Sequence, residues 1–208
     1  AVGVLNLNEA PTDIMADRSL AFNENTAPGT LLATFNRSDA DAADTATYAL
    51  VPSYDGGGHY TLSSAGVLRA GNVATNYEAA SSHTIRVQVT DAGGLSYDKD
   101  FNIGVLNVNE APTDIATDRS LAFNENTAPG VVLASFSRSD VDAGDTATYV
   151  LVPSFDGGGR YTLSTAGVLS AGSVATNYEA ASSHPIRVRV TDAGGLSYEK
   201  DFTVAVQN

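Results

Sequence analysis

Apolar and polar residues alternate along many short stretches of this chain, whereas patterns typical of helices are scarce. The clearest case is residues 83–89, in which Ile85, Val87 and Val89 are separated by polar residues. Successive side chains of an extended strand point to opposite faces, so this alternation puts the apolar side chains on one face. The stretch is therefore predicted to be a β-strand with one buried and one exposed face.

The first hundred or so residues contain further strand candidates, each short and bounded by Gly, Pro, Asn or Asp. They are residues 19–25, 29–35, 47–51, 60–62, 67–68 and 96–105. Short strands separated by turn residues in this way are typical of two packed antiparallel sheets with Greek-key connections. We therefore predict an all-β fold built from seven-stranded Greek-key β-sandwiches of the immunoglobulin-like kind.

The chain repeats itself. Residues 8–107 recur as residues 109–208 at a constant offset, with most positions identical. A fixed offset over this length indicates two copies of one folded unit. The expected domains are residues 8–107 and 108–208. Residues 1–7 resemble the end of the first copy and are expected to be the tail strand or linker of a preceding repeat, as in a piece cut from a longer array.

The segment that joins the copies, residues 107–112, reads Asn-Val-Asn-Glu-Ala-Pro. It is short and polar, and its proline biases the preceding residue toward an extended backbone. We expect a semi-rigid linker, unlike a flexible tether rich in Gly and Ser.

The amino-acid composition excludes several kinds of partner and site. The formal net charge is −13, which argues against nucleic acid as a partner because its phosphates would be repelled. There are no cysteines, so disulfides and thiolate metal sites are excluded. No apolar stretch approaches the ~18 residues that a membrane-spanning helix needs, so no membrane insertion is expected, and Ala1 begins no signal peptide.

Acidic residues recur at fixed places in both copies. In a seven-stranded sandwich, Glu24, Asn76 and Glu78 are expected at the end near the following linker, and Asp-x-Asp and the lone Asp of each copy at the opposite end. If the copies stack head to tail, the first group would face Asp140, Asp142 and Asp192 of the second copy. Clustered carboxylates repel one another, and carboxylate, amide and backbone oxygens are the ligands that calcium prefers.

A structural alternative exists for the same residues. Asp39 and Asp41, or Asp140 and Asp142, could simply form turns, because Asp side chains stabilise turns without a metal. Their occurrence together with the other acidic positions favours calcium. Asp145 and its counterpart Asp44 are expected to cap a local turn instead.

Several motifs resemble a known family. Asn-Glu-Ala-Pro in the linker, Glu-Asn-x-Ala-Pro-Gly at the first strand, Asp-x-Asp, Tyr-Glu and Val-Thr-Asp-Ala-Gly-Gly-Leu look like those of the bacterial cadherin-like tandem repeats of secreted adhesins. The resemblance covers both copies and implies cadherin-like domains with calcium between them. The ligands it implies are Glu24, Asn76, Glu78, Asn107, Asn109, Glu110, Asp140, Asp142 and Asp192.

The chain departs from this family at three of those positions. Asn76 and Asn107 stand where the family usually has Asp, and Glu110 replaces an Asp. Two formal negative charges are lost, so fewer ions or weaker binding than in the animal proteins is expected.

The function implied by the resemblance is that of a calcium-binding extracellular segment at a bacterial cell surface. Such a segment would serve cell adhesion, aggregation or biofilm cohesion, with homophilic contacts. The alternative is a calcium-dependent lectin that binds acidic exopolysaccharide, because the chain is also similar to rhizobial proteins with two such domains. Tyrosines 54, 60, 77 and 97 could stack on sugars or pack in the core.

Catalysis has little support in the sequence. Each copy contains a Ser-His pair that could suggest a nucleophile and its base, Ser82 with His83 and Ser183 with His184. Adjacent residues of a strand point to opposite faces, so neither pair could act together. The chain is expected not to be an enzyme.

Overall fold

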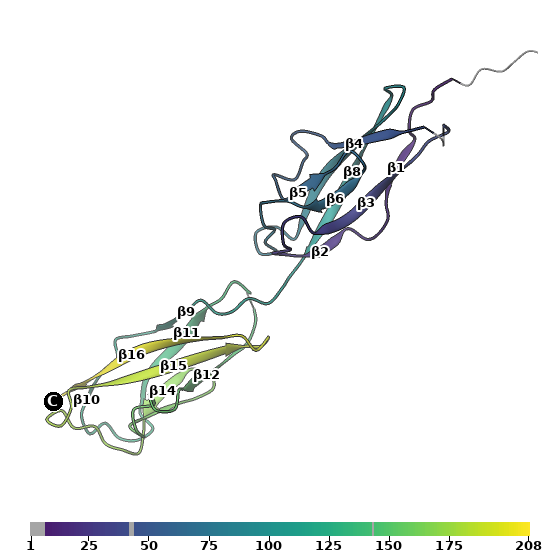
Figure 1. The fold of residues 1–208 in the computed structure, drawn as a ribbon. Helices are drawn as coiled ribbons and strands as arrows, with labels where there is room; N and C mark the ends of the chain where they lie inside the picture. Colours follow the sequence, from purple (N-terminus) through teal and green to yellow (C-terminus); the bar gives the residue numbers. More distant parts are fainter. Residues whose placement is uncertain (1–6, 42–43, 143) are drawn as a thin grey trace, which may run out of the picture. The chain divides into compact units, whose positions relative to one another are not determined.

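In the computed structural model, every regular element within the described residues, 7–41, 44–142 and 144–208, is a β-strand (Figure 1). Contacts between residues divide the chain into two units, Ala1–Val108 and Asn109–Asn208, which we call domain 1 and domain 2. The tail strand expected before the first copy lies outside the described residues except for Leu7, which is exposed. The described residues form no helix long and apolar enough to cross a lipid bilayer.

Domain 1 contains eight strands within its described residues. They are β1 (Asp13–Ala16), β2 (Ala21–Asn23), β3 (Leu31–Ser38), β4 (Ala46–Leu50), β5 (Tyr60–Leu62), β6 (Val67–Ala70), β7 (Ser82–Asp91) and β8 (Ser96–Leu106). They form two sheets, in the orders β1-β3-β6-β5 and β2-β8-β7-β4. Neighbouring strands are antiparallel except β2 and β8, which run parallel.

Domain 2 repeats this arrangement strand for strand. Its described strands are β9 (Asp114–Thr117), β10 (Ala122–Asn124), β11 (Val132–Ser139), β12 (Ala147–Leu151), β13 (Tyr161–Leu163), β14 (Val168–Ala171), β15 (Ser183–Asp192) and β16 (Ser197–Gln207). The sheets have the orders β9-β11-β14-β13 and β10-β16-β15-β12, and β10 runs parallel to β16.

The predicted β-sandwich is confirmed, but the prediction of seven strands per domain is wrong because β1 and β9 were missed. Each has four residues and a single fully buried side chain, Ile14 or Ile115. One buried residue produces no alternation for a sequence pattern to show. The strand exists because β1 pairs with β3 at a sheet edge, after which the chain crosses to the other sheet as β2.

The core of each domain lies between its two sheets. In β7, Ile85, Val87 and Val89 are fully buried, as the alternation predicted. From the facing sheet, Phe35 and Leu68 join the same cluster. Each such side chain contributes about 1.5–3 kcal/mol to folding by leaving water.

This topology positions the acidic residues. Because β2 runs parallel to the end of β8, the residue after β2, Glu24, lies beside the chain as it leaves the domain. At the other end of the sandwich, Asp91 is the last residue of β7, and its N–H and carboxylate bond to Leu95 across the hairpin turn. Domain 2 places Asp192 at the end of β15 in the same way.

Candidate metal centre

Glu24 is a buried carboxylate with a hydrogen bond to each oxygen. Its Oε1 accepts the backbone N–H of Val108 at 2.9 Å, and its Oε2 accepts that of Tyr77 at 2.9 Å. The residue is only 2% exposed. A buried charge must be compensated by hydrogen bonds or by a cation, and here two backbone amides supply part of that compensation.

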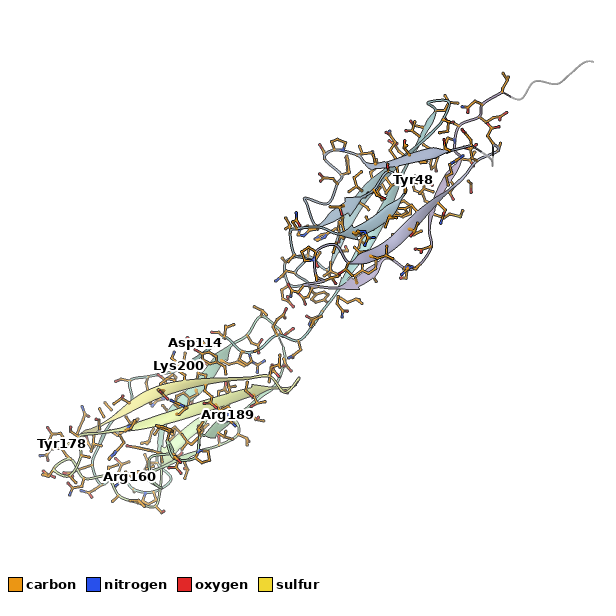
Figure 2. The ribbon with its side chains drawn as sticks, in the orientation of Figure 1. Tyr48, Asp114, Arg160, Tyr178, Arg189 and Lys200 are labelled. Atoms are coloured by element: carbon orange, nitrogen blue, oxygen red, sulfur yellow. The ribbon has the colours of Figure 1, made fainter. Side chains whose placement is uncertain are left out.

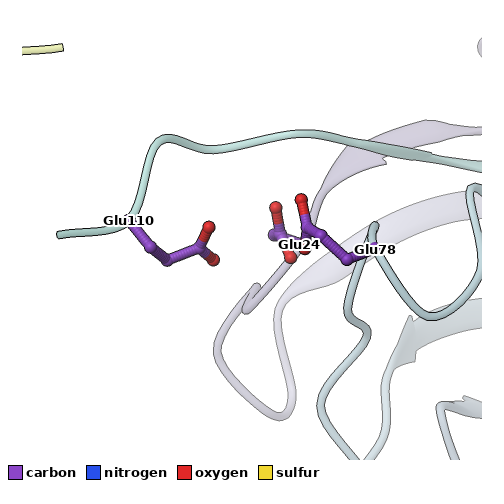
Figure 3. A group of neighbouring side chains, drawn as sticks. All are labelled: Glu24, Glu78 and Glu110. Carbon is purple, nitrogen blue, oxygen red and sulfur yellow. The ribbon is translucent and has the colours of Figure 1, made fainter. Parts of the chain in front are cut away.

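Glu78 brings a second carboxylate to Glu24. Oxygens of the two side chains lie within 4.8 Å of one another, and Figure 3 shows them side by side. Asn76, two residues earlier, uses its side-chain oxygen locally, because Oδ1 accepts the N–H of Ala79 at 2.6 Å. The structure therefore brings Glu24 and Glu78 together and gives Asn76 a role in the turn that carries Glu78.

Domain 2 gathers another group of acidic side chains, at the end of its sandwich where β15 ends. Oxygens of Asp140, Asp145 and Asp192 lie within 4.8 Å of one another, and Asp192 is buried. Calcium–oxygen distances are about 2.3–2.6 Å, so two ligands on opposite sides of one calcium ion lie about 4.6–5.2 Å apart. Magnesium–oxygen distances are about 2.0–2.1 Å, which gives about 4.0–4.2 Å. The carboxylate spacing and donor type are compatible with calcium.

Arg138, at the end of β11, was not singled out in the sequence. Its Nε donates to Asp140 Oδ2 at 2.9 Å, and its Nη2 donates to the Asp145 carbonyl at 2.9 Å. The side chains of Arg138 and Asp140 are only 13% and 4% exposed. The guanidinium thus offsets one charge of the acidic group and braces the turn that contains it. Arg37 and Asp39 make the same pair in domain 1.

The first residues of domain 2 are attached to this acidic group. The Asn109 side chain donates to Asp192 Oδ2 at 3.1 Å, and the backbone N–H of Glu110 donates to Asp142 Oδ2 at 2.8 Å. Gly194, in the hairpin turn, allows this approach, because a Cβ there would collide with the Asn109 amide. Asp142 is buried, and Asn107 is exposed.

Asp145 was expected only to cap a local turn, and the structure gives it a larger part. One oxygen does accept the N–H of Thr146 at 2.7 Å, as expected. The other accepts the N–H of Ala193 at 3.1 Å, and the carboxylate belongs to the acidic group described above. The recurrence of this aspartate as Asp44, which contacts Ala92 in the same way, was the signal in the sequence.

The chain is similar in sequence to cadherin-repeat proteins, although no family model matches it. It is 30% identical to human protocadherin-1 over 136 residues, which cover 63% of this chain and 13% of that protein. It is 29% identical to protocadherin alpha-2 of Pan troglodytes over 153 residues, covering 69% of this chain and 16% of that protein. The chain therefore spans a small part of the length of these relatives.

Solved structures show the same fold. Repeats EC22-24 of mouse cadherin-23 superpose with a TM-score of 0.69 at 22% identity, covering 91% of this chain and 63% of that chain. Repeats EC1-2 of human protocadherin-24 give a TM-score of 0.72 at 17% identity, covering 91% and 95%. Both domains are thus cadherin-like β-sandwiches. Cadherin repeats are a non-enzymatic family, which agrees with the expectation that this chain is not an enzyme.

Proposed function

We propose that this chain is an extracellular segment of adhesion type, in which calcium bound at the linker stiffens the connection between two cadherin-like domains. The observation that carries the proposal is the hydrogen bonding of three consecutive linker residues. The Val108 N–H is bound by Glu24 of domain 1, whereas Asn109 and Glu110 are bound by aspartates of domain 2. Consecutive Cα atoms are about 3.8 Å apart, so the chain itself tethers the two acidic groups closely.

Electrostatics supplies the reason for a cation. Within each domain, carboxylate oxygens lie within 4.8 Å of one another, Glu24 with Glu78 in domain 1 and Asp140 with Asp145 and Asp192 in domain 2. Two like charges 4 Å apart repel by about 1 kcal/mol in water and by about 4 kcal/mol at an effective dielectric constant of 20. Arg138 offsets only part of this charge. The proposed ligands are those that the sequence suggested, with Asp145 added: Glu24, Asn76, Glu78, Asn107, Asn109, Glu110, Asp140, Asp142, Asp145 and Asp192.

Bound calcium would neutralise these carboxylates and fix the linker. A chain of repeats held in this way can act as an extended arm that presents homophilic contacts and joins cells. The similarity to protocadherins supports an extracellular location. A bacterial cell surface, aggregation and biofilm cohesion stay predictions from the sequence motifs.

The proposal is tested by thermal unfolding in calcium, magnesium and chelator. Each independent ion adds about 1.4 kcal/mol of stability at ten times its dissociation constant. Sites in extracellular modules typically have dissociation constants of about 10⁻⁴–10⁻³ M, so millimolar calcium should raise Tm well above the value in chelator. Magnesium should raise it much less. Equal shifts from the two ions would indicate charge screening and contradict the proposal.

Small-angle X-ray scattering tests the mechanical part separately. With calcium, the distribution of interatomic distances should be narrow and extended, because the linker is fixed. In chelator the particle should sample a wider range of dimensions. Identical scattering in both conditions would mean that calcium does not stiffen the linker.

A second candidate function is binding of acidic polysaccharide with the help of calcium. It is favoured by the exposure of two of the four tyrosines considered for sugar stacking: Tyr54 is 47% and Tyr77 39% exposed, whereas Tyr60 is buried and Tyr97 is half-buried. Tyr77 directly precedes Glu78. Retention of an acidic exopolysaccharide in calcium, lost both in chelator and in Tyr77→Ala, would support this function. Binding that Tyr77→Ala leaves unchanged would contradict a role for this residue.

A further inference from the structure

Domain 2 contains a half-buried arginine for which the described residues provide no carboxylate. Arg160 directly precedes β13, and Figure 2 labels it. Its Nη1 donates to the Gly157 carbonyl at 3.1 Å, which uses one of the five N–H donors of a guanidinium. A partly buried charge of this kind calls for an anion from outside the chain. The other arginines of domain 2 each lie beside a carboxylate: Arg119, Arg138, Arg187 and Arg189.

The next residue, Tyr161, has a buried hydroxyl that the described residues leave without a hydrogen bond. The residue is 4% exposed. A buried polar group without a partner is costly, so in a native fold such a group is explained by a water, an ion or a ligand. Burial raises the pKa of Tyr161 to about 12, so the hydroxyl keeps its proton and can donate it in a hydrogen bond at neutral pH.

The guanidinium and the hydroxyl belong to one small cavity. Arg160 and Tyr161 line it together with apolar residues such as Leu133 and Val174. The ring centroid of His184 lies 6.1 Å from that of Tyr161. Burial lowers the pKa of His184, and the positive charge of Arg160 lowers it further. Burial raises the pKa of Tyr161, and the same charge opposes this rise. The charge of Arg160 therefore acts on the groups around the cavity.

We propose that Arg160 and Tyr161 bind the carboxylate group of an acidic sugar. The cavity has a volume of about 10 Å³, which is room for about one oxygen atom. One carboxylate oxygen accepts the Tyr161 O–H there, and the guanidinium pairs with the same carboxylate. Val174 is 43% exposed and offers apolar contact to the sugar ring.

Charge and function narrow the ligand to a sugar acid. The net charge of −13 repels a dianion more strongly than a monoanion, which favours a carboxylate over a phosphate. The choice of a sugar over other carboxylic acids rests on the acidic polysaccharide proposed above as the second candidate function. This contact needs no calcium, unlike the one proposed at Tyr77.

Domain 1 has the same positions without the site. His59 stands in place of Arg160, and the Tyr60 hydroxyl is hydrogen-bonded to Nδ1 of His83 at 3.0 Å. The His59 ring stacks on the His83 ring, with centroids 4.5 Å apart. The hydroxyl already has its partner, and no guanidinium accompanies it. The site is therefore assigned to domain 2 alone.

The test is an NMR titration of the full 208-residue chain with sodium glucuronate in chelator, with glucose and acetate as controls. Amide signals around Arg160 and Tyr161 should shift and saturate with glucuronate, and glucose should not shift them. Tyr161→Phe removes only the hydroxyl and should weaken binding by about tenfold or more, since hydrogen bonds to charged groups are strong. Arg160→His, which copies domain 1, should weaken binding similarly, whereas Tyr60→Phe should leave it unchanged.

Thermal unfolding without ligand separates a ligand site from a cavity that holds a permanent water. Tyr161→Phe removes an unpaired hydroxyl and should leave Tm unchanged or raise it. Tyr60→Phe breaks the hydrogen bond to His83 and should lower Tm. An equal fall in both variants would mean that Tyr161 has a partner inside the fold, and it would overturn the proposal.

The titration can also contradict the proposal in two ways. Glucuronate binding that Tyr161→Phe leaves unchanged would exclude the site, and equal affinity for acetate would exclude recognition of the sugar. Because chelator is present, a failure of calcium binding at the linker does not affect this result. Retention of an acidic polysaccharide in calcium, without glucuronate binding in chelator, would reject this site and leave the second candidate function standing.

Discussion

Glu24 and Glu125 occupy the same position in two nearly identical domains, yet their surroundings differ. Both accept the N–H of a tyrosine through Oε2, from Tyr77 and Tyr178 respectively. Glu24 also accepts the N–H of Val108 and is 2% exposed, whereas Glu125 is half-buried. The extra hydrogen bond of Glu24 comes from the linker and not from the domain sequence. We therefore expect Glu24 to contribute more to calcium binding than Glu125.

The opposite ends of the domains show no such difference. Asn8 donates to Asp91 in domain 1 as Asn109 donates to Asp192 in domain 2. The linker residues before a domain are thus attached to that domain in the same way in both copies. Because the two domains themselves are alike, we expect calcium affinity to depend on the segments that precede and follow each domain.

The largest effect is expected from removing the guanidinium that pairs with the buried aspartate. Arg138→Met leaves Asp140 buried without its partner, which typically costs about 3–5 kcal/mol. Arg37→Met should cost domain 1 a similar amount in chelator. Calcium should restore more stability to Arg138→Met than to Arg37→Met, as measured by urea unfolding followed through NMR signals of each domain. Equal restoration in the two variants would mean that the aspartates beside Arg37 and those beside Arg138 do not differ in calcium binding.

A smaller effect is expected at the glycine that admits the linker. Gly194→Ala should displace the Asn109 side chain from Asp192, lowering stability by about 1 kcal/mol and weakening calcium binding. Gly93→Ala should displace Asn8 at a similar cost in stability while leaving calcium affinity nearly unchanged. Calorimetry in parallel with thermal unfolding separates the two effects. Equal losses of calcium affinity would contradict the linker site.

The smallest expected effect is a dependence of the stability of domain 1 on pH. Burial, and secondarily the charge of His59, lowers the pKa of His83 from its ordinary value of 6.5. Unfolding then favours protonation, so the stability of domain 1 is complete above pH 6.5 and declines as the pH falls below it. His59→Gln removes the second cause and should make this decline shallower. Urea midpoints between pH 8 and 5 measure the decline, and an equally steep profile in His59→Gln would contradict the coupling.

Much of the fold could be predicted because its signals are local. The alternation of Ile85, Val87 and Val89 directly reports which face of β7 is buried. The strand β1 could not be found in this way, because it is defined by pairing with β3 and buries only Ile14. Long-range pairing at a sheet edge leaves little trace in a short segment.

The candidate site was predicted in part for the same reason. Asp140, Asp142 and Asp192 repeat Asp39, Asp41 and Asp91 of the first copy, and this repetition indicated a shared role. The structure gathers the three residues of the second copy at one end of domain 2. The part of Arg138 could not be predicted, since in the sequence it is one of several polar residues on a strand. Its significance arises only when the following turn folds back and brings the Asp145 carbonyl to its Nη2.

The central claim is that calcium binds where the linker joins the acidic groups of two domains. Calcium titration of Glu24→Ala and Glu125→Ala, in the 208-residue chain expressed alone, tests it most directly. The two substitutions remove the same side chain from nearly the same sequence. Glu24→Ala should abolish most of the high-affinity calcium binding, and Glu125→Ala should leave it nearly intact. Equal losses from the two substitutions would place the ions within each sandwich and contradict the account.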